Sequence, residues 1–119
     1  MASILIVEDE AQIAAFMAKG LERAGYQTEI ATDGHDALAL VQAVQFDLVL
    51  LDLGLPGLDG WSVMVQILAQ AVHPPIIIVT AVDGVDERQR CLNLGAVDYI
   101  IKPFRFSDLL ASVRRHFPA

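Results

Sequence analysis

Five short runs rich in isoleucine, valine and leucine recur along the chain, separated by segments with helical spacing. The runs lie at residues 4–7, 28–31, 48–51, 76–80 and 98–101. Each has the length of a β-strand. After the first run, apolar residues fall at i, i+3, i+4 and i+8: Ile13, Phe16, Met17 and Leu21. This spacing is typical of a helix with one buried face, so strand and helix alternate five times.

Strands that are apolar without interruption are usually buried on both faces, which indicates a parallel sheet covered by helices on either side. The sequence therefore predicts an α/β fold with a five-stranded, doubly wound parallel sheet. Residues 1–119 suit a single domain. Residues that commonly begin or end helices agree with this alternation: Gly25, Asp33, Gly34, Gly60, Gly95 and Ser107. We expect Gly60 to precede the third helix and Ser107 to cap the fifth.

The chain carries eight basic and fifteen acidic residues, a formal net charge of −7. Such a surface repels phosphodiester backbones and anionic lipids, so we expect no direct contact with nucleic acid or membranes. Cys91 is the only cysteine, which excludes an internal disulfide. The first apolar run has only four residues and is followed by acids. It predicts neither a signal peptide nor a membrane span, which suggests the cytoplasm.

Reactive side chains stand at the ends of four of the five apolar runs. Glu8 and Asp9 follow the first run, Asp52 follows the third, Thr80 ends the fourth and Lys102 follows the fifth. The carboxyl ends of parallel strands share one edge of the sheet, where doubly wound sheets bind ligands. One polar residue at a strand end commonly just meets solvent. The full set is less easily explained this way, so we expect it to converge in one shallow cleft.

Three carboxylates at this edge need a compensating cation. Two carboxylates ~4 Å apart repel by roughly 4 kcal/mol at an effective dielectric constant of 20. Lys102 supplies one positive charge, and a divalent ion would balance the rest. Oxygen ligands without nearby histidine or cysteine favour a hard metal, and a few carboxylates completed by water favour Mg²⁺. Mn²⁺ could substitute for it.

A carboxylate beside a metal ion, a lysine and a hydroxyl could attack a phosphoryl group, because these neighbours would stabilise its equatorial oxygens. Asp52 is the expected nucleophile, since carboxylates form aspartyl phosphates as covalent intermediates. Gly54 can turn the backbone so that its carbonyl faces the metal ion. Ala81 is small enough to leave the approach for the incoming group open.

Four motifs together resemble the receiver domain of bacterial two-component response regulators. They are VEDE after the first run, LDLGLPGLDG around the third, VTA at the fourth and DYIIKPF at the fifth. The match spans the whole chain. It implies a flavodoxin-like sheet with strand order 2-1-3-4-5 and five helices. It also implies that a sensor histidine kinase or a phosphotransfer protein supplies the phosphoryl group.

The same resemblance assigns the chemistry of the site to individual residues. Asp9, Asp52 and the Gly54 carbonyl would hold Mg²⁺. Glu8 would assist through a water molecule, and Lys102 would contact the phosphoryl oxygens. Catalysis would be limited to the domain's own phosphorylation and dephosphorylation, so the chain is not expected to be a turnover enzyme.

The resemblance also implies a conformational switch. Thr80 would move towards the new phosphoryl group, and Tyr99 would turn inward behind it. This would remodel the surface made by the fourth helix, the fifth strand and the fifth helix. From propensity alone, Tyr99 would be an ordinary, half-buried strand aromatic. The peptide bond between Lys102 and Pro103 is expected to be cis.

Two segments, DLGLPGLDG and GAVDYIIKPF, are typical of receivers that precede a winged-helix DNA-binding domain, which implies transcription regulation. In that subgroup, ion pairs across the fourth and fifth helices join two receivers. Arg88 and Asp108 lie where one such pair would form. Val97 stands where an acid is common, and Ser112 where an arginine is common. The resemblance thus implies a homodimer with an incomplete set of ion pairs.

Three alternatives share parts of this pattern. A haloacid-dehalogenase-type phosphatase also uses a strand-end aspartate, a hydroxyl residue, a lysine and Mg²⁺, but it would need a second acid where Gly54 stands. A flavin-binding module would need a glycine- and hydroxyl-rich phosphate loop, where EDEAQ stands instead. A receiver that acts only as a binding platform would not need the complete acceptor set.

Overall fold

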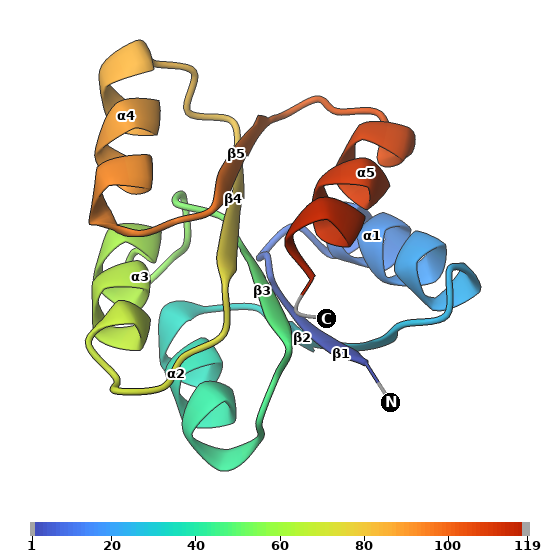
Figure 1. Cartoon of the computed structure of the whole chain (residues 1–119), viewed down its shortest axis with the longest axis horizontal. Coiled ribbons are helices and arrows are strands. Elements are labelled where there is room, and N and C mark those ends of the chain that lie inside the picture. The colour runs from blue at the N-terminus through green and yellow to red at the C-terminus, as the bar shows by residue number, and fades with distance from the viewer. Residues whose placement is uncertain (1, 118–119) are drawn as a thin grey trace.

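The computed structural model describes residues 2–117 and has five parallel strands in the order β2-β1-β3-β4-β5. The strands are β1 (Ser3–Val7), β2 (Gln27–Ala31), β3 (Leu48–Leu51), β4 (Ile76–Thr80) and β5 (Asp98–Ile101). The helices are α1 (Ala11–Arg23), α2 (Gly34–Ala43), α3 (Gly60–Leu68), α4 (Val85–Leu94) and α5 (Phe106–His116). Helices α1 and α5 cover one face of the sheet, and α2, α3 and α4 cover the other (Figure 1). The predicted doubly wound α/β fold is confirmed.

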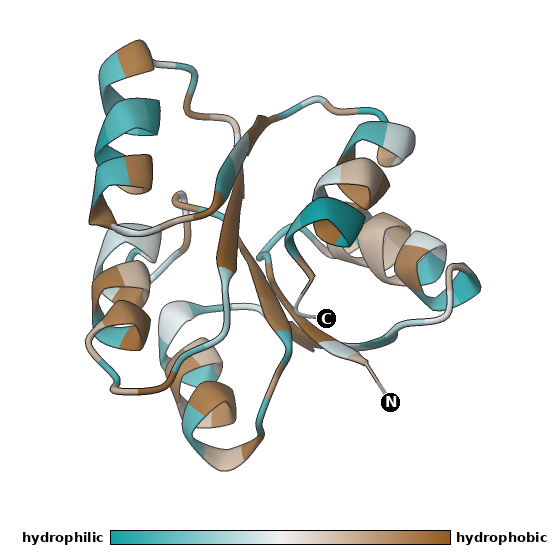
Figure 2. Ribbon diagram, in the orientation of Figure 1, coloured by the Kyte–Doolittle hydropathy of each residue, from teal (hydrophilic) through white to brown (hydrophobic). Residues whose placement is uncertain are grey.

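The three central strands are apolar because helices cover both of their faces. Every residue of β3 and β4 is buried, as are the last four of β1. The hydropathy colouring shows these strands as strongly hydrophobic (Figure 2). The edge strand β2 is different, since it exposes Glu29 and Ile30. In the three central strands, polar side chains therefore occur only at the strand ends. Among residues 2–117, no helix is both long enough and apolar enough to cross a membrane.

Local sequence signals explain most of the helix ends. Asp33 caps α2, because its side chain accepts a hydrogen bond from the Asp36 N–H at 2.8 Å. Gly95 ends α4 with φ of 125°, a conformation that favours glycine. Gly60 was expected to precede α3 but is its first residue, since Asp59 takes the capping position. This shift by one residue changes nothing in the order of elements.

The prediction that Ser107 caps α5 is wrong. The helix begins two residues earlier than such a cap would place it, at Phe106, and Arg105 occupies the N-cap position without a side-chain hydrogen bond. Packing of Phe106 fixes this start, because its ring lies edge-on to Phe16 of α1, with centroids 5.9 Å apart. Phe16 was expected on the buried face of α1 but is 51% exposed. The packing of Phe106 in α5 against Phe16 in α1 thus outweighs the capping preference of Ser107.

Candidate functional site

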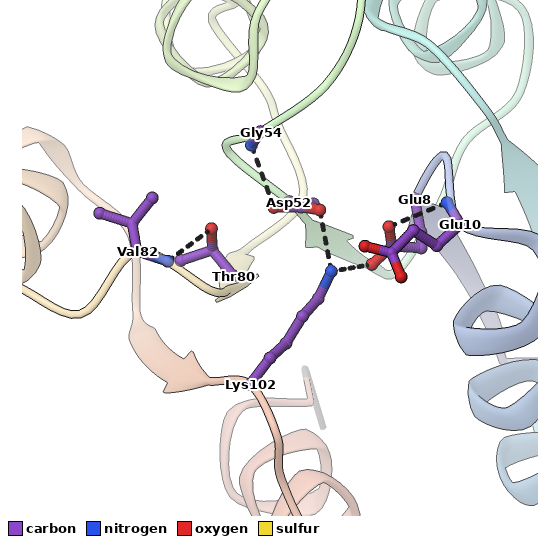
Figure 3. Close-up of polar contacts among 7 residues, drawn as sticks. All are labelled: Glu8, Glu10, Asp52, Gly54, Thr80, Val82 and Lys102. Atoms are coloured by element: carbon purple, nitrogen blue, oxygen red, sulfur yellow. Dashed lines mark hydrogen bonds and ion pairs between the residues drawn. The ribbon is translucent and has the colours of Figure 1, made fainter.

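The carboxyl ends of β1, β3 and β5 bring Glu8, Asp52 and Lys102 together, as the sequence predicts. The Lys102 ammonium donates a hydrogen bond to Asp52 Oδ2 at 2.9 Å and forms an ion pair with Glu8 Oε1. Figure 3 shows the lysine side chain reaching between the two carboxylates. Glu8 is 2% exposed and Asp52 6%. One ammonium group is therefore shared by two buried acids.

Asp9 completes an acidic cluster with these two carboxylates. Glu8, Asp9 and Asp52 each offer a carboxylate oxygen, and the three oxygens lie within 4.8 Å of one another. Asp9 is exposed to solvent, whereas the other two are buried. The single charge of Lys102 cannot balance three carboxylates. Carboxylate oxygens at this spacing are suitable ligands for a hard divalent cation, so the donor set fits the predicted Mg²⁺.

Asp52 is held in its ionised form. Burial raises its pKa, but the hydrogen bond from the Gly54 N–H to Oδ1 at 3.0 Å and the bond from Lys102 together hold the pKa below its ordinary value. Both oxygens of the carboxylate are thus oriented by donors. The sequence reading assigned Gly54 a role through its carbonyl only. The contact of its N–H was missed, because no residue letter reports a backbone donor.

Glu8 and Lys102 respond to burial in opposite ways. Burial raises the pKa of Glu8 above its ordinary value, although the hydrogen bond from Lys102 opposes this rise. Burial alone would lower the pKa of Lys102, but its bonds to Glu8 and Asp52 raise it above the usual range. Lys102 therefore stays an ammonium group. The Glu10 N–H donates to Glu8 Oε2 at 3.2 Å, and the bond between Lys102 and Pro103 is cis, as predicted.

The approach to the site is open beside Ala81. A hollow of about 400 Å³ is lined by Glu10, Ile13, Phe16, Ala81, Lys102, Pro103 and Phe104. Ala81 is exposed at this hollow. Thr80, directly before it, is 1% exposed. Lys102, whose ammonium bonds to Asp52, is among the residues that line this hollow.

Tyr99 already points inward in this structure. It is 4% exposed, and its hydroxyl donates a hydrogen bond to the Val82 carbonyl at 2.6 Å. Burial raises the pKa of Tyr99 to about 12. The Thr80 hydroxyl accepts a hydrogen bond from the Val82 N–H at 3.3 Å. One loop residue, Val82, thus joins Tyr99 and Thr80, the two residues predicted to take part in the switch. A loop valine gives no sequence signal for this role.

The residues predicted to pair two chains lie on the surface of α4 and α5. Arg88 and Asp108 are both exposed. Ser112, by contrast, is buried, and its hydroxyl donates to Asp98 Oδ2 at 2.5 Å. Arg115 contacts the same oxygen at 3.4 Å. Asp98 is therefore engaged within the chain at the start of β5.

Comparisons with known proteins agree with this geometry. Residues 4–114 match the family model described as response regulator receiver domain. The chain is 45% identical over 111 residues to the transcriptional regulatory protein HprR of Escherichia coli K12, covering 93% of this chain and 49% of HprR. It is 41% identical to the transcriptional regulatory protein PcoR of Escherichia coli, covering 96% of this chain and 50% of PcoR. The Francisella response regulator 1452 receiver domain superimposes with a TM-score of 0.91 at 31% identity, covering 97% of this chain and 95% of that domain.

A doubly wound 2-1-3-4-5 sheet with acids and a lysine at its carboxyl edge defines a signalling receiver. The chain belongs to the response regulator receiver family, whose members act in two-component systems. The alternative of a haloacid-dehalogenase-type phosphatase is not supported. The chain spans about half the length of the curated relatives named above.

Proposed function

We propose that this receiver accepts a phosphoryl group on Asp52 from the phosphohistidine of a sensor histidine kinase or a phosphotransfer protein. The observation that carries the proposal is the state of Asp52, a buried carboxylate held ionised by Gly54 N–H and Lys102. An Asp52 oxygen would attack phosphorus, the bond between phosphorus and the histidine nitrogen would break, and the imidazole would leave. The product would be an aspartyl phosphate.

Neighbouring residues would stabilise the group in transfer. Lys102 would contact the phosphoryl oxygens, since its ammonium already lies at Asp52 Oδ2. Glu8, Asp9, Asp52 and the Gly54 carbonyl would hold Mg²⁺, directly or through water, and Mn²⁺ would substitute. The ion would supply the positive charge that lets an anionic phosphoryl group approach three acids. The chain would catalyse only its own phosphorylation and dephosphorylation.

The donor protein would bind at the hollow beside Lys102. The apolar residues that line this hollow include Ile13, Phe16 and Phe104. The ring of Phe16 is half exposed and lies 6.2 Å from that of Phe104. Aromatic side chains exposed around an open entrance are suitable contacts for another protein. Docking there would place the phosphohistidine next to the acceptor.

The response would pass to the surface of α4, β5 and α5. Thr80 would move towards the phosphoryl group, and Tyr99 would hold the loop behind it. Phosphorylated chains would then associate through this surface, with Arg88 of one copy near Asp108 of the other, which sedimentation would reveal as a doubled mass. The regulators that this chain resembles control transcription, so we extend the proposal to a winged-helix DNA-binding output domain and to the cytoplasm.

The test is incubation with acetyl phosphate, with and without Mg²⁺, followed by intact-mass measurement. We expect one phosphoryl group per chain in the presence of Mg²⁺ and none when the metal is chelated. Release of inorganic phosphate should stop once the acetyl phosphate has been consumed by labelling and slow self-hydrolysis. Continued, rapid turnover of a generic phosphomonoester would instead indicate a phosphatase.

Replacing Lys102 with methionine is expected to destabilise the metal-free chain and to tighten Mg²⁺ binding. Loss of one partner from a buried ion pair costs about 3–5 kcal/mol, and the lower end applies because the lysine retains some exposure. Without the ammonium, the acidic cluster should bind Mg²⁺ at least about tenfold more tightly. Urea denaturation with and without Mg²⁺ measures both effects. The exposed Lys19→Met is the control. Equal Mg²⁺ affinity in Lys102→Met and wild type would contradict the idea that Lys102 and Mg²⁺ compensate the charge of the same carboxylates.

A further inference from the structure

Helices α2 and α3 begin with the same pair of residues. Asp33 and Asp59 occupy the N-cap positions, and Gly34 and Gly60 are the first helical residues. Each aspartate accepts a hydrogen bond from the N–H three residues further on. Neither glycine has a positive φ, and alanine is the better helix former. The backbone conformation requires glycine at neither position, which leaves the space around each residue as the reason.

Gly34 lies against the loop that joins β3 to α3, residues 52–59. A Cβ at position 34 would overlap the Leu58 carbonyl oxygen, and it would lie 2.8 Å from Val63 Cγ2 and 2.9 Å from Leu58 Cβ. Gly34 is buried, and helices α2 and α3 lie side by side on one face of the sheet (Figure 1). The absence of a side chain at Gly34 therefore lets the start of α2 contact the backbone of the β3–α3 loop.

The β3–α3 loop also holds the acceptor carboxylate. The Gly54 N–H, within this loop, donates to Asp52 Oδ1 at 3.0 Å. Leu53 and Leu55 are buried in the apolar core, and Leu58 is partly buried against the same core. A shift of the Leu58 backbone must be taken up within this short loop, so it would disturb the donor that orients Asp52.

The other side of the contact is tied to Glu8. Only two residues separate Gly34 from Ala31, the last residue of β2, whose carbonyl accepts a hydrogen bond from the Glu8 N–H at 2.9 Å. A side chain at position 34 fits only if the start of α2 or the β3–α3 loop moves. The first movement pulls on the strand end bonded to Glu8, and the second pulls on the loop bonded to Asp52. Either movement changes the spacing within the acidic cluster.

We propose that Gly34 is a positioning residue for the phosphoacceptor site. It sets the distance between the end of β2 and the β3–α3 loop, and through them the spacing of Glu8 and Asp52. This inference rests on the proposed function, in which the acidic cluster holds Mg²⁺. Replacing residues that orient metal ligands commonly lowers metal affinity by about 10- to 100-fold. The lower end applies here, because Gly34 acts through the backbone and touches no ligand.

The test is Gly34→Ala, measured on the folded chain. Calorimetric titration should show Mg²⁺ binding about tenfold weaker than in wild type. Labelling by acetyl phosphate at saturating Mg²⁺ should be about tenfold slower, because the acceptor is misplaced. In the metal-free chain, hydrogen exchange of the Gly54 N–H or of the Glu8 N–H should be faster, because the hydrogen bond of the displaced segment weakens.

Ala37→Gly is the matched control. Ala37 is a buried residue one turn further along α2, so its replacement weakens the helix without pushing it against the loop. Mg²⁺ affinity and labelling of the folded control should match wild type. Adding Val63→Ala to Gly34→Ala removes the contact with Val63 Cγ2 but leaves the overlap with the Leu58 carbonyl, so it should restore neither property.

The possible results separate this inference from the proposed function. Wild-type Mg²⁺ affinity in Gly34→Ala would overturn the positioning role, as would an equal loss in Ala37→Gly or restoration by Val63→Ala. If Gly34→Ala does not fold, Leu58→Ala removes the half-buried anchor on the loop side. It should also weaken Mg²⁺ binding, and wild-type affinity would overturn the role. Wild type that binds no Mg²⁺ would instead refute the phosphoacceptor function, and the exchange rates would still test the contact.

Discussion

Asp52→Asn is expected to abolish phosphorylation by acetyl phosphate while leaving the fold intact. The amide has nearly the same shape as the carboxylate, and its oxygen can keep the hydrogen bond from the Gly54 N–H that now reaches Oδ1. It cannot act as an anionic nucleophile. It removes one of the two carboxylates that share the Lys102 ammonium, and the ion pair with Glu8 remains. Labelling should fall by at least about 100-fold, as expected when a nucleophile is removed.

Intact-mass measurement over a time course checks this expectation, with Asp59→Asn as the matched control. Asp59 is the N-cap of α3 and accepts a hydrogen bond from the Ser62 N–H at 2.9 Å. Asparagine caps helices about as well as aspartate, so the control should be labelled like wild type. Persistent labelling of Asp52→Asn would place the acceptor on another residue. Loss of labelling in both variants would point to a general effect of charge or folding.

The fold and the acceptor cleft were predictable because the signals are local. The central strands are apolar except for Ser3 and Thr80 at their ends. Each reactive residue stands directly at a strand end, so the topology alone brings Glu8, Asp52 and Lys102 to one edge. Because the central strands are buried on both faces, the boundary between each apolar run and the polar residue at its end is clear in the sequence. The strand bounds from the sequence differ from the observed ones by at most one residue, at the first residues of β1 and β2.

What the sequence did not reveal depends on backbone groups and on tertiary packing. The N–H of Gly54 makes a hydrogen bond that side-chain identity does not predict. The same is true of the N–H and the carbonyl of Val82. The start of α5 follows the ring of Phe106, whose partner lies on α1, far away in the chain. The capping preference of Ser107 is a local signal, and tertiary context commonly overrides such signals.

Ser112 stands where the resemblance led us to expect an arginine, and in the structure the serine bonds within its own chain. An arginine at this position could reach another chain, whereas the serine is short enough to turn onto Asp98 of its own chain. Arg115 occupies the same carboxylate oxygen. The Tyr99 N–H donates to the other oxygen of Asp98 at 2.8 Å. An acid with several partners within its own chain is less available for an ion pair between chains. Any association through α4, β5 and α5 would thus depend more on Arg88 and Asp108.

Gly60→Ala is expected to be the most destabilising single-methyl change near the site. A Cβ at this position would overlap the Asp52 carbonyl oxygen and the Leu53 Cα, and it would lie 3.0 Å from the Asp52 carbonyl carbon. These are backbone atoms of the acceptor strand's end, so they cannot rotate away. Overpacking typically costs about 1–3 kcal/mol. Here the cost should reach about 3 kcal/mol or more, because the backbone itself must shift.

Urea denaturation and the rate of labelling by acetyl phosphate together measure this effect. Gly84→Ala is the control, since the atoms nearest to its new Cβ belong to the Glu87 carboxylate, which can rotate aside. It should cost no more than about 1 kcal/mol. The folded fraction of Gly60→Ala should be labelled more slowly than wild type, because the shift moves Asp52 relative to Lys102. If the folded fraction is labelled at the normal rate, packing of α3 on the acceptor strand supports stability but does not position the nucleophile.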